Sequence, residues 1–312
     1  MLWALIGLLL GGFLAWYNSA PPLVGGGQPD GIRARWVKSR VYQDVAPVDE
    51  QGFARLTPQN AGGWYGVFRE PIQTLENYKS QNPMRPTTQR GVLVIQPIGA
   101  MNAEQTAMLQ SLKEFCEAFF QLPVRVEAPL GLQSLKQERN ERGQLDAGKI
   151  IDDILAPRLP ADAAAYLGVT MTDLTAGDMN YVFGVGSFER RTGIYSLCRY
   201  FPEFWGRKST GDDEVRALRR ACQVLAHESG HVFGLQHCVL YKCAMNGSNS
   251  LGDADGAPLD FCPVCHRKLL WNGGSDGAKR YAGLLAFYRK HGLAEEARWT
   301  KARLARWKQI AA

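Results

Sequence analysis

Three of the five histidines in this 312-residue chain stand within residues 227–237, in the run His-Glu-Ser-Gly-His-Val-Phe-Gly-Leu-Gln-His. Histidines four positions apart on a helix share one face, so His227 and His231 can reach a single ion. Gly234 tolerates dihedral angles that side chains penalise, which would let the chain turn sharply and bring His237 back as a third ligand. The pattern therefore predicts a helix over residues 213–234 with a three-histidine metal site at its end.

Three neutral imidazoles leave one position of a tetrahedral zinc ion open for water, as a hydrolytic site requires. Glu228 would project beside the ion, where its carboxylate can accept a proton from that water. Met245 follows His237 closely and would form an apolar floor beneath the imidazoles without ligating. The alternative is an ordinary amphipathic helix, but five such fixed positions coincide by chance on the order of 10⁻⁸ times per starting point.

A second set of candidate ligands follows at once. Cys238 adjoins the last histidine, Cys243 comes five residues later, and Cys262 and Cys265 form a Cys-x-x-Cys pair. Four thiolates make a closed tetrahedral site with no position for substrate, so this zinc would be structural. Residues 246–261 between them are turn-rich and poor in apolar side chains, and a metal clip would stabilise them. Unrelated thiols or disulfides are the alternative.

The cysteine total of seven is odd, which favours metal chemistry over a disulfide scaffold. Cys116, Cys198 and Cys222 lie in apolar segments and are predicted to be buried free thiols. A cysteine switch formed by Cys198 or Cys222 has no support beyond the presence of the thiols. His266 adjoins Cys265 and is predicted to be a bystander, since four thiolates already complete a site.

The arrangement resembles the archaemetzincin family of zinc metallopeptidases, in which the metzincin histidine signature and its methionine are combined with a four-cysteine zinc site. The matching residues are His227, Glu228, His231, Gly234, His237, Cys238, Cys243, Met245, Cys262 and Cys265. Further similarity appears at residues 94–99, 167–174 and 180–184, and the whole resemblance covers roughly residues 64–299. The interval between Met245 and Cys262 is slightly shorter than is usual in the family.

The resemblance implies a metzincin-like α/β domain with a mixed sheet, an active-site helix and a C-terminal subdomain that carries the second zinc site. It implies two zinc ions per chain, one catalytic and one structural, and a peptide or protein substrate. The reaction would be peptide-bond hydrolysis by zinc-activated water with Glu228 as general base. A strand near residues 181–185 would line the cleft and pair with extended peptide.

Local patterns agree with an α/β class, because strands alternate with helices before a region of helices and loops. Strands are predicted at residues 91–96, 124–128, 165–170, 181–188 and 193–199, and helices at 103–122, 146–155, 213–234, 277–291 and 294–309. The last two strands would form a hairpin. By domain, residues 1–24 are an apolar segment, 25–90 an irregular arm or linker, and 91–312 the metallopeptidase domain.

The apolar segment precedes any charged residue, and the first is Asp30. Basic residues follow at Arg33, Arg35, Lys38 and Arg40, so an uncleaved anchor would leave the body of the protein on the cytoplasmic side. Thiolate zinc sites fit a reducing compartment. We therefore expect a membrane-associated protein with a cytoplasmic catalytic domain. Secretion after cleavage of a signal peptide is the alternative, although a basic n-region is missing.

The net charge of +6 is too diffuse to imply nucleic acid as a partner. The basic residues between positions 189 and 220 are predicted to form a solvated face. Two non-enzymatic alternatives are a catalytically inactive metzincin-fold peptide-binding protein and a metal storage or sensing protein. The retained Glu228 disfavours the first, and an open three-histidine site disfavours the second. The sequence leaves four questions open. They are endopeptidase versus aminopeptidase action, the substrate preference, whether residues 25–90 cover the cleft, and the oligomeric state.

Overall fold

The apolar runs of the first half of the chain form a five-stranded sheet in the computed structural model, which describes residues 50–57, 64, 70–135 and 139–311. The strand order is β2 (Val124–Val126), β1 (Val92–Ile98), β4 (Ala163–Thr170), β7 (Thr192–Ser196) and β6 (Gly184–Ser187). Neighbouring strands run parallel except β6, which pairs antiparallel with β7 at the edge. The predicted α/β class with a mixed sheet is confirmed.

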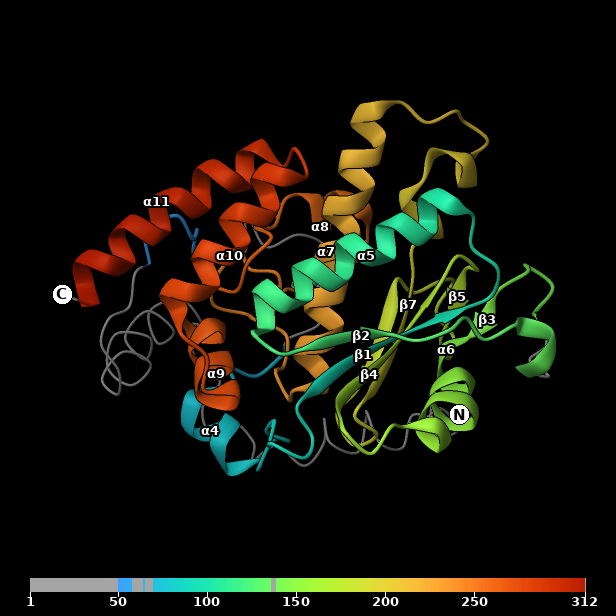
Figure 1. Cartoon of the computed structure of the whole chain (residues 1–312), viewed down its shortest axis with the longest axis horizontal. Coiled ribbons are helices and arrows are strands. Elements are labelled where there is room, and N and C mark those ends of the chain that lie inside the picture. The colour runs from blue at the N-terminus through green and yellow to red at the C-terminus, as the bar shows by residue number, and fades with distance from the viewer. Residues whose placement is uncertain (1–49, 58–63, 65–69, 136–138, 312) are drawn as a thin grey trace, which may run out of the picture.

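Helices cover both faces of this sheet, which is why β4 is buried at every position. Alternate side chains of β1 divide between the two faces: Leu93 and Ile95 pack with α5 (Ala103–Phe120) and α7 (Gly211–Val232), whereas Val94 and Ile98 pack with η3 (Ile150–Leu155). Figure 1 shows α5 lying across the sheet, with the C-terminal helices to one side of it.

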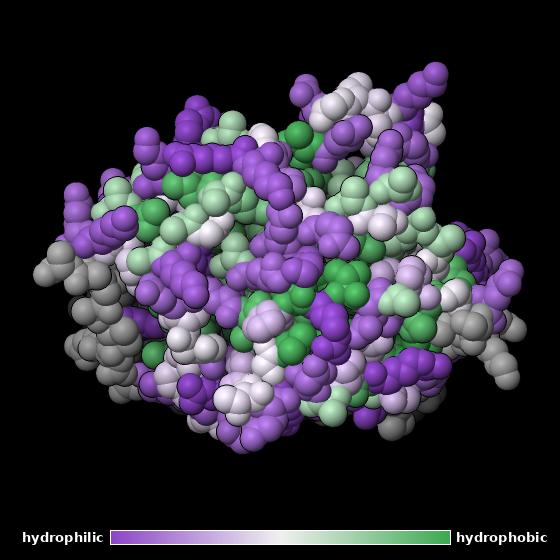
Figure 2. Space-filling view, in the orientation of Figure 1, coloured by the Kyte–Doolittle hydropathy of each residue, from purple (hydrophilic) through white to green (hydrophobic). Residues whose placement is uncertain are grey.

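The remaining elements are short or belong to the C-terminal part. They are α4 (Leu75–Ser80), η2 (Leu132–Leu135), β3 (Leu145–Asp146), α6 (Ala147–Lys149), η4 (Ala156–Arg158), β5 (Leu174–Thr175), η5 (Cys198–Tyr200), η6 (Pro202–Trp205), α8 (Leu251–Asp255), α9 (Pro263–Gly273), α10 (Gly277–Lys290) and α11 (Ala294–Ala311). Strands β3 and β5 pair in a separate two-stranded sheet. Helix α10 packs on both α5 and α11, and Figure 2 shows hydrophilic residues mixed with apolar ones over this face of the molecule.

Most of the predicted elements are confirmed within a few residues of their expected ends. The expected helix at 146–155 differs in type, since α6 gives way to the π-helical η3, yet its predicted inner residues Ile150, Ile151 and Leu155 are buried. Helix α8 lies within residues 246–261, which the sequence indicated as a turn-rich loop, and α9 was not among the predicted helices. Helix α9 has Pro263 in its first turn, where proline is common, but the sequence analysis did not use this signal.

The prediction of a solvated basic face is wrong for part of residues 189–220. The side chains of Arg199, Arg219 and Arg220 are only 15–19% exposed, because each pairs with a carboxylate brought from elsewhere in the chain. Their partners are Asp173, Glu296 and Asp255. Because these partners lie far away in the sequence, the residues around each arginine do not reveal that it is paired and buried.

The N-terminal expectations fall largely outside the described residues, including all of the apolar segment at 1–24. Within the part of the chain that the structure describes, no helix has the length and hydropathy needed to cross a bilayer. Two described pieces of the arm pack on the domain. The backbone of Ala54 and Leu56 bonds to Lys242 and Leu240, and α4 lies against α9.

Candidate metal centres

The three histidines of the 227–237 run meet at one point. Their candidate ligand atoms all lie within 4.8 Å of one another. His227 and His231 stand one turn apart near the end of α7, and their Nε2 atoms are 3.0 Å apart. Gly234 follows the helix with a φ of +86°, a conformation that favours glycine, and the chain then returns His237 to the other two. The structure thus brings together the residues that the spacing selected.

The two histidines on α7 are oriented by carbonyl oxygens. Nδ1 of His227 lies 2.8 Å from the oxygen of Ala244, and Nδ1 of His231 lies 2.8 Å from that of Leu235. Because a carbonyl oxygen can only accept, both Nδ1 atoms must carry the proton, and both Nε2 atoms present lone pairs. Two lone pairs only 3.0 Å apart repel each other unless a cation lies between them. The donor set therefore fits a metal ion.

The charge state of these rings also fits a metal site. Burial, with the neighbouring His237 acting in the same direction, lowers the pKa of His227 to about 3. Burial likewise places the pKa of His231 well below its usual value. Both imidazoles are therefore neutral at pH 7, which is the form that binds metal. Three neutral imidazoles are a common donor set for zinc with an open position.

Glu228 lies beside the histidines and against the edge strand β6. Its residue is 6% exposed, and burial raises the pKa of its carboxyl group to about 8, opposed by a hydrogen bond from the Gly186 backbone. Two glycines of β6 permit this close approach. A Cβ on Gly184 would lie 2.7 Å from the Glu228 Cγ, and one on Gly186 would lie 2.5 Å from the Glu228 carbonyl oxygen. A carboxyl group with a raised pKa can hold a transferred proton and pass it on.

The two glycines of β6 were not singled out as site residues by the sequence analysis. A glycine inside a strand often marks a close approach of another backbone, so the Gly-Val-Gly run was an available signal. The observed strand begins later than the resemblance implied, at Gly184, and Val182 before it bridges to Leu174.

Met245 is fully buried beneath α7. Its sulfur is so near to Gly230 that a Cβ there would overlap it, and Gly230 lies between the two helical histidines. Only a glycine at this place lets the methionine approach the helix turn that carries His227 and His231. This is the position that a floor beneath the imidazoles would occupy.

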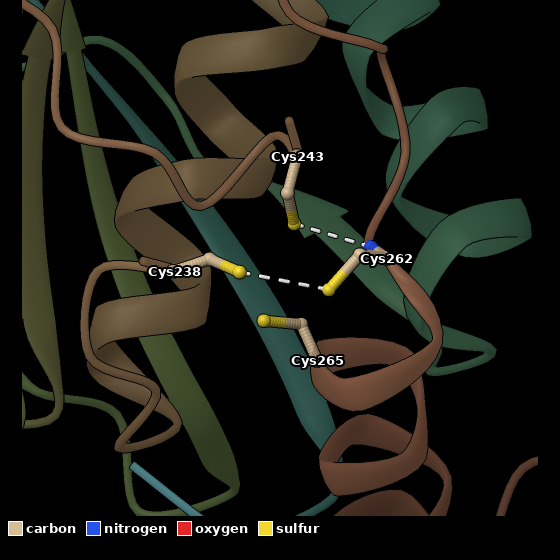
Figure 3. A group of neighbouring side chains, drawn as sticks. All are labelled: Cys238, Cys243, Cys262 and Cys265. Carbon is tan, nitrogen blue, oxygen red and sulfur yellow. Dashed lines mark hydrogen bonds between the residues drawn. The ribbon is translucent and has the colours of Figure 1, made fainter. Parts of the chain in front are cut away.

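The four cysteines form a second cluster, with all four sulfur atoms within 4.8 Å of one another and every residue buried (Figure 3). The sulfurs of Cys238 and Cys262 are 3.6 Å apart. Backbone amides donate to the Cys243 sulfur, from Cys262 at 3.1 Å and from Met245 at 3.5 Å. All seven cysteines of the chain are described as free thiols, so the disulfide alternative is contradicted.

The thiols of this cluster influence each other's ionisation. Hydrogen bonds from the other three thiols lower the pKa of Cys238 well below its usual value, whereas burial raises the pKa of Cys243 and Cys262. A divalent cation would favour all four thiolates, and amide donors onto sulfur support a thiolate, so the residues fit zinc.

The remaining sulfur and imidazole groups lie apart from both clusters. Cys116, Cys198 and Cys222 are buried free thiols, as predicted. The Cys198 sulfur contacts Ser196 at 3.2 Å and does not join the three histidines. His266 packs on Tyr281, with its Nδ1 3.3 Å from the phenol oxygen, and is not a member of the cysteine cluster.

A carboxylate that the sequence analysis missed contacts the third histidine. Oε1 of Glu70 lies 2.7 Å from Nδ1 of His237, and both side chains are largely buried. Trp64 packs edge-on against the same imidazole, with ring centroids 5.1 Å apart. Glu70 precedes His237 by 167 positions, so no motif could have linked the two. The arm therefore reaches the histidine cluster.

Comparison with known proteins finds relatives of this chain. Residues 142–270 match the model of Peptidase family M54. Archaemetzincin-2 of Rattus norvegicus is 31% identical over 266 residues, which cover 75% of this chain and 74% of that protein. Archaemetzincin of Thermococcus kodakarensis is 36% identical over 185 residues, covering 58% of this chain and 96% of that protein. A crystal structure of archaemetzincin from Archaeoglobus fulgidus, complexed with malonate, is 30% identical with a TM-score of 0.47, covering 57% of this chain and 99% of that one.

An α/β domain with these relatives is a zinc metallopeptidase, a hydrolase that acts on peptides or proteins. Within that class, the chain belongs to the archaemetzincin family, because it shares 31% identity with a family member over most of the length of both proteins. The family and enzyme class predicted from the sequence are thus confirmed.

Proposed function

We propose that the chain hydrolyses peptide bonds at a zinc ion held by His227, His231 and His237, with Glu228 as general base. The observation that carries this proposal is the convergence of the three imidazoles, two of them with Nδ1 held by carbonyl oxygens, beside a buried carboxyl group. A zinc ion, when bound, supplies Lewis acidity that lowers the pKa of water and polarises a carbonyl group.

The chain's own groups would carry the protons and hold the substrate. Glu228 accepts a proton from the attacking water and later donates it to the leaving amine. Its buried position raises the pKa of its carboxyl group, which favours holding the proton until it passes to the leaving amine. Among the described residues β6 is the edge strand of the sheet, so an extended peptide would pair with its outer side, and Gly184 and Gly186 bring that strand close to Glu228.

We also propose that Cys238, Cys243, Cys262 and Cys265 hold a second, structural zinc ion, giving two per chain. The four buried sulfurs leave no open side for a substrate. Their role is to fix the loops that follow α7. Met245 lies between the two centres and would support the helical histidines from below without binding metal.

The test is a zinc count on the full chain and on Glu228→Ala, with turnover of a peptide library by both. We expect two zinc ions per chain in each, and a kcat/KM in the variant lower by about 10²–10⁴-fold. Two zinc ions without cleavage by the wild type would favour the alternative of a peptide-binding protein with this fold. Equal cleavage by both would remove Glu228 from the mechanism.

A further inference from the structure

The third histidine differs from the first two in how it is held. His227 and His231 stand on α7, and carbonyl oxygens orient both rings. His237 lies beyond the helix, after the left-handed Gly234, in the turn formed by residues 233–237. A ligand on an irregular turn has more freedom than one on a helix, so something outside the turn must fix it.

Two buried side chains of the N-terminal arm hold the backbone of that turn. The hydroxyl of Tyr78 donates to the carbonyl oxygen of Phe233 at 2.7 Å. The amide of Gln73 donates to the carbonyl of Gly234 at 2.9 Å and accepts from the N–H of Gln236 at 3.1 Å. Gln73 is 5% exposed and Tyr78 is fully buried, so water cannot readily replace these bonds.

A third side chain of the arm holds the ligand itself. Glu70 lies 2.7 Å from Nδ1 of His237, where the other two histidines have carbonyl oxygens. A carboxylate at Nδ1 fixes the tautomer that leaves Nε2 free, and it makes the imidazole a stronger donor to a metal. The Trp64 ring packs edge-on against the imidazole, which limits its rotation.

The same arm also contacts the helix that carries part of the cysteine cluster. Nζ of Lys268, on α9, donates to Oε1 of Gln73 at 2.9 Å, and Lys268 is 3% exposed. Gln73 therefore joins the turn before His237 to the helix that bears Cys265. The contacts of residues 70–78 with the turn involve polar, directional bonds and not packing alone.

We propose that Glu70, Gln73 and Tyr78, which we call the brace, are positioning residues that hold His237 in its metal-binding geometry. The inference rests on the proposed three-histidine zinc site and adds to it a set of residues from outside the signature. Glu70 acts on the imidazole, whereas Gln73 and Tyr78 act on the turn. Without the brace, two ligands on α7 remain, and the third loses its fixed orientation.

The test uses the full chain loaded with Co²⁺ in place of zinc, in four forms. These are the wild type, Glu70→Ala, Glu70→Gln and the control Glu104→Gln, which removes an exposed carboxylate in the first turn of α5. Thiolate-to-cobalt charge transfer reports the cysteine site. Total cobalt minus that amount gives occupancy of the histidine site during titration with a chelator.

We expect Glu70→Ala to weaken metal retention at the histidine site by about 10–100-fold while the thiolate band stays unchanged. Glu70→Gln should fall between Glu70→Ala and the wild type, because its amide oxygen can still accept the bond from Nδ1. Glu104→Gln should match the wild type. This graded pattern is one that loss of general stability does not produce.

Unchanged retention in Glu70→Ala, or parallel loss of metal from both sites, would overturn the brace. If Glu70→Ala does not fold, Glu70→Gln decides in its place, since wild-type retention by that variant overturns the inference. Failure of the proposed three-histidine site would give a different result, because the wild type itself would then bind no cobalt at the histidines. A wild type that binds metal but cleaves no peptide leaves the brace intact and overturns only the peptidase mechanism.

Discussion

The histidine and cysteine clusters are built differently as candidate metal sites. Two histidines stand on one long helix, so their geometry exists before any ion arrives. The cysteines come from the segment after α7 and from the start of α9, and all four are buried (Figure 3). A preformed helical site needs little from the metal, whereas a site built from loops needs the metal to bring its parts together.

The two clusters are nevertheless joined through the backbone. His237 and Cys238 are adjacent, and Ala244, whose carbonyl oxygen orients His227, follows Cys243 directly. The Cys238 amide also donates to the carbonyl of Met245 at 2.7 Å. The two sites should therefore depend on each other to different degrees. Loss of the cysteine site should disturb the histidine site, and the reverse effect should be small.

The strongest test of this inequality is Cys262→Ser. Structural zinc sites contribute on the order of 10 kcal/mol of apparent binding free energy, comparable to the whole stability of a domain. We expect loss of both metal ions, a lower unfolding temperature and no peptide turnover. Elemental analysis and thermal unfolding followed by circular dichroism would measure this. A variant that keeps a full histidine site would show that the clusters are independent.

His231→Ala gives the reverse comparison and a smaller structural effect. It removes one ligand from α7, so the histidine site should lose its metal and peptide turnover should fall to background. One zinc per chain should remain on the cysteines, and the fold should stay intact. The variant loses only the stabilisation that metal binding at the histidine site adds to the folded state. Zinc analysis with near-ultraviolet circular dichroism checks this. Complete unfolding would contradict the inequality.

Gly186→Ala tests the contact between β6 and the histidine helix. The new Cβ would lie 2.5 Å from the Glu228 carbonyl oxygen, so the strand and helix must separate. Overpacking of this kind costs about 1–3 kcal/mol. We expect lower stability by that amount and reduced kcat/KM, with both zinc ions retained. Gly206→Ala, where nothing lies within 4 Å of the Cβ, is the steric control, although its φ of +71° adds local strain.

Met245→Leu should have the smallest effect of the four. The substitution nearly conserves volume, and such changes in a core usually cost less than about 1.5 kcal/mol. If Met245 only supports the imidazoles by packing, both zinc ions should stay bound and kcat/KM should change only slightly. Loss of zinc from the histidine site would show instead that the sulfur itself contributes to binding.

Local sequence patterns predicted the parts of the molecule that depend on local order. The histidine spacing selected His227, His231 and His237, which the structure brings together, and apolar periodicity located β1, β4 and the long helices. The patterns failed where stability comes from distant partners. Glu70 lies 167 positions from His237 and Gln73 lies 161 positions from Gly234, so neither pair forms a periodic or spaced motif.

Short helices were missed for a related reason. Helix α4 has six residues, and α8 has five, too few to show a helical period. Each begins after an N-cap side chain, which is Thr74 for α4 and Ser250 for α8. The cap of α4 is visible only once the helix is known, because Thr74 and Asn77 do not form the usual Ser/Thr-x-x-Glu box.

The adjacency of His237 and Cys238 has a consequence for how the protein acquires its metals. Residues 237–245 contain both His237 and the Ala244 carbonyl, and an ion on Cys238 and Cys243 would add two metal–thiolate bonds that hold this segment. We expect loading to be sequential, with the thiolate cluster filled before the histidine cluster. Under scarce zinc, the population would then consist of folded, singly loaded molecules that await the ion needed for catalysis.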